Sequence, residues 1–189
     1  MNISIQKPKN QPLIDYRGND ADWNAFQEAA KKIPADFEVP MVIAGEEVRS
    51  KEKIDSIDPS TGKVFCRAQK ATADHAKAAI EAALAAKEAW ARLPIPARVQ
   101  KFRDLEWILY QRRHETMAVA ARECGFIAGE VSGSWAEMMD FIRFNPWFLL
   151  ELSRLTLGDG TNETNTMHLR SLKGFTCAIT PFNFPIAIN

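Results

Sequence analysis

The stretch that most constrains the fold is the last one, residues 173–189. Residues 175–179 form a short apolar run with β-branched members, and Thr180 and Pro181 stop it. An apolar run that ends at turn residues is typical of a strand buried on both faces. We therefore expect a buried strand in a parallel sheet, which requires an α/β fold whose helices cover that sheet.

A Pro-Phe-Asn-Phe-Pro sequence follows the predicted strand and holds one amide side chain between two rigid residues. Pro181 and Pro185 fix the backbone on either side of Asn183. Ligands bind at the carboxyl ends of strands in open α/β sheets, where an amide N–H can donate to a developing oxyanion. The alternative is that Asn183 only satisfies the backbone of the turn, and turn chemistry alone favours that alternative.

Residues 174–185 resemble the strand and loop that enter the cofactor site of the NAD(P)-dependent aldehyde dehydrogenase superfamily. The resemblance implies an oxidoreductase that oxidises an aldehyde with NAD as its cofactor, and it makes Asn183 an oxyanion-hole residue. It implies an α/β fold, the N-terminal part of a Rossmann-type cofactor domain with an N-terminal arm and a hairpin. It also implies four cofactor-binding residues: Ile179, Thr180, Pro181 and Phe182.

Three further segments resemble the L-glutamate γ-semialdehyde (1-pyrroline-5-carboxylate) dehydrogenase branch of that superfamily, namely residues 38–48, 78–90 and 140–145. The implied substrate is L-glutamate 5-semialdehyde, which is in equilibrium with 1-pyrroline-5-carboxylate and is oxidised to L-glutamate. The sequence departs from the branch at residues 132–134, where acidic residues are usual, and at Pro185, where threonine is frequent. These departures bear on the identity of the aldehyde.

The composition is that of an ordinary globular protein, with 46% hydrophobic residues and 24 basic residues against 24 acidic ones. A zero net charge without a basic stripe argues against a nucleic-acid partner. No segment has the length and apolarity of a signal peptide or a membrane span, so we expect no membrane association and a cytoplasmic location. The expected partners are a small-molecule aldehyde and, from the resemblance, further copies in a homo-oligomer.

The sequence contains three widely spaced cysteines with no metal-ligand spacing: Cys66, Cys124 and Cys177. We expect reduced structural thiols and no metal site. Cys66 and Cys177 lie in apolar runs, whereas Cys124 lies at a predicted helix end and is the thiol that we expect to be most exposed. The three histidines are expected at the surface or fully hydrogen-bonded.

Residues 1–36 are expected to form an N-terminal arm, and residues 37–189 the N-terminal portion of the NAD-binding domain. The arm carries one predicted helix, which Asp20 or Asp22 caps and which runs to Ala30. Trp23 and Phe26 are its main apolar anchors. We therefore expect the arm to contain one short helix ahead of the first strands.

Apolar runs around Ala44 and Gly45 predict a hairpin within residues 37–49. Further strands are predicted at residues 63–67 and 167–172. Helical periodicity then predicts three helices that cover the sheet: one from Thr72 or Asp74 to the prolines of 93–96, one over 97–123, and one from Ser132 or Ser134 that Pro146 kinks or breaks.

The resemblance also implies a polypeptide longer than 189 residues. In that superfamily the nucleophilic cysteine, the general-base glutamate and further cofactor motifs follow the Pro-Phe-Asn-Phe-Pro sequence. We therefore expect this chain to be an N-terminal part that is inactive and marginally folded alone, because its last strand would leave a sheet edge exposed. The alternative hypothesis is a non-catalytic module that associates with a full-length relative through a sheet edge or residues 1–36.

Overall fold

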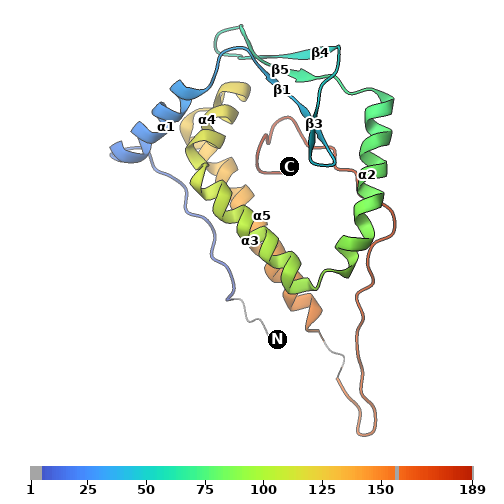
Figure 1. Ribbon diagram of the computed structural model, residues 1–189. Coiled ribbons are helices and arrows are strands. Elements are labelled where there is room, and N and C mark those ends of the chain that lie inside the picture. Colours follow the sequence, from blue (N-terminus) through green and yellow to red (C-terminus); the bar gives the residue numbers. More distant parts are fainter. Residues whose placement is uncertain (1–5, 156–157, 189) are drawn as a thin grey trace.

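The described helices fall into a packed group and one separate helix (Figure 1). The structure is a computed structural model that describes residues 6–155 and 158–188. The packed group consists of α1 (Asp20–Lys32), α3 (Ile95–Gln111), α4 (Arg113–Cys124) and α5 (Ala128–Ser153). Helix α2 (Ala73–Arg92) stands on the far side of the molecule, and the C-terminal segment returns to the space between (Figure 1).

Short strands cross one end of the molecule and form two small sheets (Figure 1). The strands are β1 (Phe37–Val39), β2 (Met41–Ile43), β3 (Glu46–Val48), β4 (Lys53–Ile57) and β5 (Val64–Gln69). In the first sheet β5 is central, parallel to β1 and antiparallel to β4. In the second sheet β2 and β3 are antiparallel, with Met41 opposite Val48.

The predicted hairpin is confirmed as the β2–β3 pair, and its turn has the expected backbone. Ala44 and Gly45 have φ values of 54° and 87°, and a tight hairpin turn favours positive φ at both central residues. The apolar run before the hairpin is divided at Pro40, which has no N–H to donate to a ladder. Strand β1 consequently pairs with β5 and not with the hairpin.

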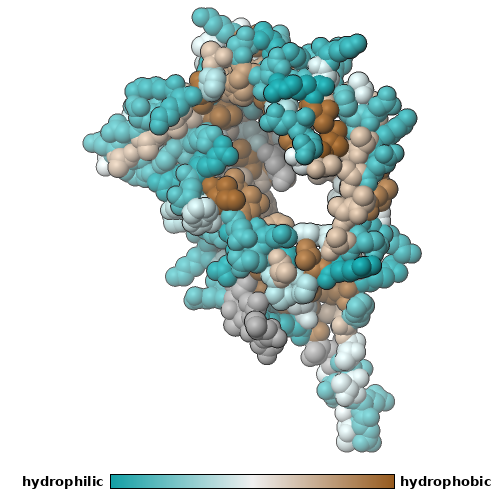
Figure 2. Space-filling view, in the orientation of Figure 1, coloured by the Kyte–Doolittle hydropathy of each residue, from teal (hydrophilic) through white to brown (hydrophobic). Residues whose placement is uncertain are grey.

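Helix α2 starts at the predicted cap. Thr72 Oγ1 accepts the N–H of His75 at 3.4 Å, and His75 Nδ1 accepts the N–H of Thr72 at 3.1 Å. The helix ends at Arg92, just before Pro94, because proline cannot continue the hydrogen-bond ladder. None of its residues is buried, and Figure 2 shows an opening through the molecule beside it.

The single helix predicted over residues 97–123 is wrong, because the chain turns at Arg112 and two helices result. Arg112 has φ −100° and ψ 17°, which lies outside the helical range, and α3 ends before it while α4 begins after it. No proline or glycine marks this turn in the sequence. The predicted stop at Gly125 is confirmed, with a left-handed φ of 71°.

Helix α5 begins earlier than predicted and continues past its proline. It starts after Ile127, whose N–H donates to Glu130 Oε2 at 3.0 Å. Isoleucine is not a usual N-cap residue, so the sequence did not reveal this start. Pro146 lies inside the continuous helix and does not break it, and Leu150 beyond it is again buried.

The core lies between helices. Its buried members come from α1, α4 and α5: Phe26, Met117, Ala118, Ala120, Val131, Trp135 and Met139. The prediction that the aromatic and methionine stripes cover a sheet is therefore wrong, because these side chains pack against other helices. The described strands are short and lie at one end of the molecule (Figure 1).

The N-terminal residues lie along the helix group, and residues 1–5 of the predicted arm lie outside the described residues. The N–H of Ile14 donates to Ser132 Oγ of α5 at 2.8 Å. Helix α1 is capped by Asn19, whose Oδ1 accepts the N–H of Asp22 at 3.2 Å. The cap is therefore one residue earlier than the first predicted position. No helix among the described residues is long and apolar enough to cross a membrane.

Candidate functional site

The predicted oxyanion and cofactor residues lie in exposed chain without regular secondary structure. Asn183 is exposed, and the side chains of Ile179 and Phe182 are 94% and 93% exposed. Only the last part of this segment is anchored: Ala187 is buried, and Ile186 packs against the core beside α4. The predictions of a buried strand at 175–179 and of a strand at 167–172 are both wrong in this structure.

The absence of the predicted strand has a simple physical cause. A strand buried on both faces needs hydrogen-bonded neighbours and helices on each side. The described strands β1, β4 and β5 form a separate sheet, and none of them pairs with residues 175–179. The apolar pattern of that stretch thus has no sheet to join within the described residues, and its side chains remain in contact with water.

The cysteines do not form a nucleophile site with Asn183 in this structure. Burial raises the pKa of the Cys66 and Cys124 thiols, and the nearby Glu123 carboxylate raises both further. A raised pKa disfavours the thiolate, which is the reactive form. Cys177 is exposed and Cys124 is half-buried, so the prediction that Cys124 is the most exposed thiol is wrong. Cys177 is exposed because the residues around it do not form the predicted buried strand.

The described residues do not form a cradle for a dinucleotide around residues 179–182. That segment lines none of the described cavities, and Ile179 and Phe182 within it are almost fully exposed. A dinucleotide pyrophosphate usually sits at a helix N-terminus next to a strand end, and here neither element adjoins the segment. The same described residues contain no group of His, Cys, Asp and Glu side chains that can hold a metal ion.

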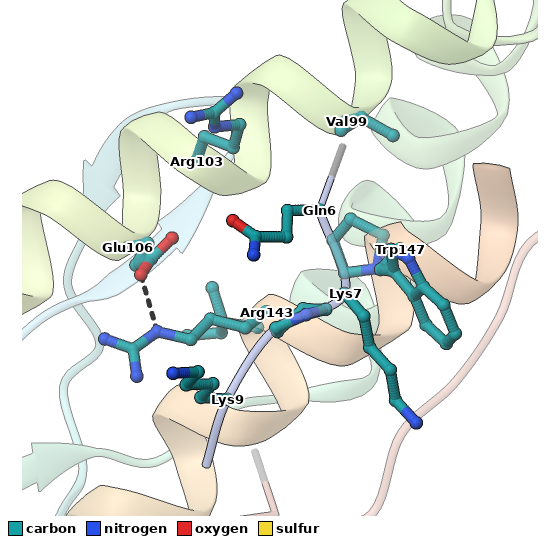
Figure 3. Close-up of a pocket in the computed structure, with 11 residues that line it drawn as sticks. Gln6, Lys7, Lys9, Val99, Arg103, Glu106, Arg143 and Trp147 are labelled. Atoms are coloured by element: carbon teal, nitrogen blue, oxygen red, sulfur yellow. Dashed lines mark hydrogen bonds and ion pairs between the residues drawn. The ribbon is translucent and has the colours of Figure 1, made fainter. Parts of the chain in front are cut away.

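A different cavity, of about 450 Å³, lies between α3, α5 and the N-terminal residues 6–9. Figure 3 shows Glu106 on α3 facing Arg143 on α5, with Gln6 between the two helices. Arg143 Nε donates to Glu106 Oε1 at 2.6 Å. Sequence reasoning missed this site, because its walls come from three segments that are far apart in the chain.

The charges around this cavity are mostly positive. Four basic residues line it, Lys7, Lys9, Arg103 and Arg143, whereas Glu106 is its one acidic residue among those that the structure describes. Lys9 extends toward the Arg143–Glu106 pair, and Lys7 extends the other way beside Trp147 (Figure 3). The cavity therefore has an excess of positive charge at the end where Lys9 and Arg143 meet.

A second polar cluster joins α1 to α4. Asp22 Oδ1 lies 2.6 Å from Arg113 Nη2 and 3.3 Å from His114 Nε2. His114 Nδ1 is buried without a hydrogen-bond partner, so the expectation of a surface or fully hydrogen-bonded histidine is wrong here. Burial lowers the pKa of His114, the Arg113 charge lowers it further, and Asp22 only partly opposes this shift.

Residues 47–189 match the model of the aldehyde dehydrogenase family, which is most of the chain and includes the Pro-Phe-Asn-Phe-Pro sequence. The chain belongs to the aldehyde dehydrogenase family. The resemblance to this family that was inferred from the sequence is thereby confirmed.

Two curated relatives of the chain are named pyrroline-carboxylate dehydrogenases. The mitochondrial delta-1-pyrroline-5-carboxylate dehydrogenase of Emericella nidulans is 33% identical over 95% of this chain and 32% of its own length. The 1-pyrroline-5-carboxylate dehydrogenase of Geobacillus sp. strain WCH70 is 32% identical over 97% of this chain and 36% of its own length. The chain thus spans about a third of the length of the curated relatives that it matches.

Solved structures confirm the expected fold class. The delta-pyrroline-5-carboxylate dehydrogenase of Mycobacterium tuberculosis, also solved with NAD bound, has a TM-score of 0.90 and 29% identity over 99% of this chain and 36% of its own. The Thermus 1-pyrroline-5-carboxylate dehydrogenase with bound NAD has a TM-score of 0.86 and 26% identity over 98% of this chain and 37% of its own. The fold is that of the N-terminal part of these enzymes.

Proposed function

We propose that the protein to which these residues belong oxidises L-glutamate 5-semialdehyde, in equilibrium with 1-pyrroline-5-carboxylate, to L-glutamate, with NAD as the hydride acceptor. The observation that carries this proposal is the family match over residues 47–189, together with relatives that are named pyrroline-carboxylate dehydrogenases. Support for NAD comes from the two solved relatives that contain it. A homo-oligomer in the cytoplasm is part of the same proposal.

Within this proposal Asn183 donates its amide N–H to the carbonyl oxygen of the aldehyde as that oxygen becomes an oxyanion, and a preorganised donor of this kind is worth about 100- to 1000-fold in kcat. The backbone restraint from Pro181 and Pro185 supports the role, because a fixed donor does not have to reorganise during the reaction. The proposed cofactor-contacting residues are those that precede Asn183: Ile179, Thr180, Pro181 and Phe182.

We also propose that residues 1–36 act as an arm and residues 37–189 as part of the cofactor domain. The 189 residues by themselves do not oxidise aldehydes, because Asn183 is exposed and because burial raises the thiol pKa of Cys66, which is buried, and of Cys124, which is half-buried. Incubation of the purified chain with NAD and the aldehyde is expected to yield no NADH, and sustained NADH formation would contradict this proposal.

The catalytic role is tested in a chimera. The 189 residues replace the corresponding N-terminal part of the Mycobacterium tuberculosis enzyme, which they match over 99% of their length. The chimera is expected to oxidise the aldehyde, and Asn183→Ala is expected to lower its kcat about 100- to 1000-fold. Asn24→Ala, on the exposed face of α1, is the matched control and leaves kcat unchanged. Equal kcat values for the two variants would refute the role of Asn183.

A second candidate function is a non-catalytic module, and the exposure of apolar side chains in the C-terminal segment favours it. Leu172, Ile179 and Phe182 are 81%, 94% and 93% exposed. Exposed apolar surface of this kind marks association sites. This function predicts that the chain co-migrates with the full-length Mycobacterium tuberculosis enzyme in size-exclusion chromatography. It also predicts that the chimera is inactive. An active chimera and separate migration would exclude it.

A further inference from the structure

We propose that the cavity between α3, α5 and residues 6–9 binds a small polyanion, whose negative charges are carboxylate or phosphate groups. Its volume of about 450 Å³ lies in the range of small-ligand sites. None of the residues 179–183 lines it, so it is distinct from the segment that carries the proposed oxidation. The proposal therefore goes beyond the proposed function and does not depend on it.

Arg143 is held in place in a way that leaves donors for a ligand. Its side chain is only 19% exposed, and Nε makes the hydrogen bond to Glu106. Its two terminal nitrogens make no hydrogen bond to other described residues. A guanidinium presents its N–H groups in a planar fork that matches carboxylate and phosphate oxygens. Glu106 thus orients Arg143 while part of the fork remains for an anion.

Lys9 supplies the second positive charge at the same end of the cavity. It extends toward the Arg143–Glu106 pair, and it forms no ion pair with any described carboxylate (Figure 3). Two cations beside a single carboxylate leave a net positive charge, which a bound anion neutralises. Arg103 adds a further positive charge at the α3 wall.

The opposite end of the cavity is apolar and does not compete for the anion. Val99 is 3% exposed and Pro146 is buried. The Lys7 ammonium lies 5.7 Å from the centre of the Trp147 ring, a cation–π distance. Lys7 therefore already has a favourable contact, and the carbon skeleton of a ligand has an apolar surface to lie on.

The N-terminal wall of the cavity is fastened to α5 and is not a free tail. Asn10 Nδ2 and the N–H of Gln11 each donate to a carboxylate oxygen of Asp140 at 2.7 Å. Two hydrogen bonds to one charged acceptor fix the chain directly after Lys9, and bonds to charged groups are the stronger kind. This attachment lowers the entropy cost of ordering Lys9 around a ligand.

The test measures binding of citrate and of pyrophosphate to the 189-residue chain by isothermal titration calorimetry, at constant ionic strength set with chloride. At least one of the two anions is expected to bind, and Lys9→Gln is expected to weaken that binding about tenfold or more. Lys101→Gln removes the same charge from an exposed position on α3 outside the cavity, and it is expected to change the affinity less than twofold.

Which of the two anions binds shows whether the negative charge of the ligand comes from carboxylate or from phosphate groups. Citrate alone indicates a carboxylate ligand, pyrophosphate alone indicates a phosphate ligand, and both indicate that charge dominates recognition. The proposal is overturned if neither anion binds, if Lys9→Gln and Lys101→Gln weaken binding equally, or if the chain shows no cooperative melt by circular dichroism. None of these results depends on whether the chain contributes to aldehyde oxidation.

Discussion

At the scale of single residues, the backbone at Gly125 restricts which side chain this position can carry. Gly125 ends α4 with a φ of 71°, and a Cβ at this position would lie 2.9 Å from Pro59 Cγ. Glycine is therefore required here for two reasons, a left-handed backbone and a close approach. Gly133, in the second turn of α5, has open space around the equivalent position.

Gly125→Ala is expected to lower the free energy of unfolding by about 1 kcal/mol or more, because alanine is strained at positive φ and meets Pro59. Gly133→Ala is the control and is expected to raise the free energy of unfolding by up to about 1 kcal/mol, because alanine favours a helix interior. Urea unfolding followed by circular dichroism measures both. Destabilisation of equal size at the two positions would show that the turn at Gly125 is not as described.

His114 gives the molecule a specific pH dependence. Burial lowers the pKa of His114 in the folded state, so the unfolded chain takes up a proton at higher pH than the folded chain does. Stability contributed by the neutral side chain is fully present above the unfolded pKa of about 6.5 and is lost as the pH falls through and below that value. His114→Gln is therefore expected to flatten the decline in Tm between about pH 7 and pH 5.

His168→Gln is the control for that measurement, because His168 is exposed in the C-terminal segment. It should leave the pH dependence of Tm as it is in the unsubstituted chain. The same pH profile for all three proteins would show that His114 does not titrate differently in the folded state.

At the scale of elements, α5 combines a buried face with an exposed apolar face. Met139 is fully buried in the helix core, whereas Phe148 is 50% exposed. The periodicity of the sequence predicted the helix and its apolar side chains. It did not distinguish the two faces, because both are apolar and only tertiary packing decides which one is covered.

Met139→Ala is expected to lower the free energy of unfolding by about 2–5 kcal/mol, since it removes a buried side chain and leaves a cavity. Phe148→Ala on the same helix is expected to have a much smaller effect, because half of its surface already faces water. Chemical denaturation of both variants checks this. A larger loss for Phe148 than for Met139 would reverse the assignment of the two faces.

The difference between local sequence and tertiary packing explains which elements were predictable from sequence. The hairpin at Ala44 and Gly45 and the cap at Thr72 depend on a few adjacent residues, so local chemistry was sufficient. The division at Arg112 and the fate of residues 175–179 depend on what lies beside them in space. An apolar run becomes a strand only where another strand offers its backbone groups.

At the scale of the whole molecule, the family was recognisable from sequence, whereas an assembled site was not. Residues 179–183 carry the proposed oxyanion and cofactor residues but lie mostly exposed, and the polyanion cavity arises where residues 6–9 meet α3 and α5. The first feature is a local pattern. The second is a tertiary arrangement of ordinary basic residues, which no local pattern in the sequence marks.

We propose that this chain carries the oxyanion and cofactor segment of a pyrroline-carboxylate dehydrogenase but does not hold NAD by itself. This proposal is tested by a thermal melt of the purified 189 residues, with and without millimolar NAD, followed by circular dichroism. A ligand of the native state at about 100 times its Kd stabilises it by about 2.7 kcal/mol. We expect a Tm that does not change with NAD. A Tm that rises with NAD concentration would contradict it, because the described residues would then form a working cofactor site.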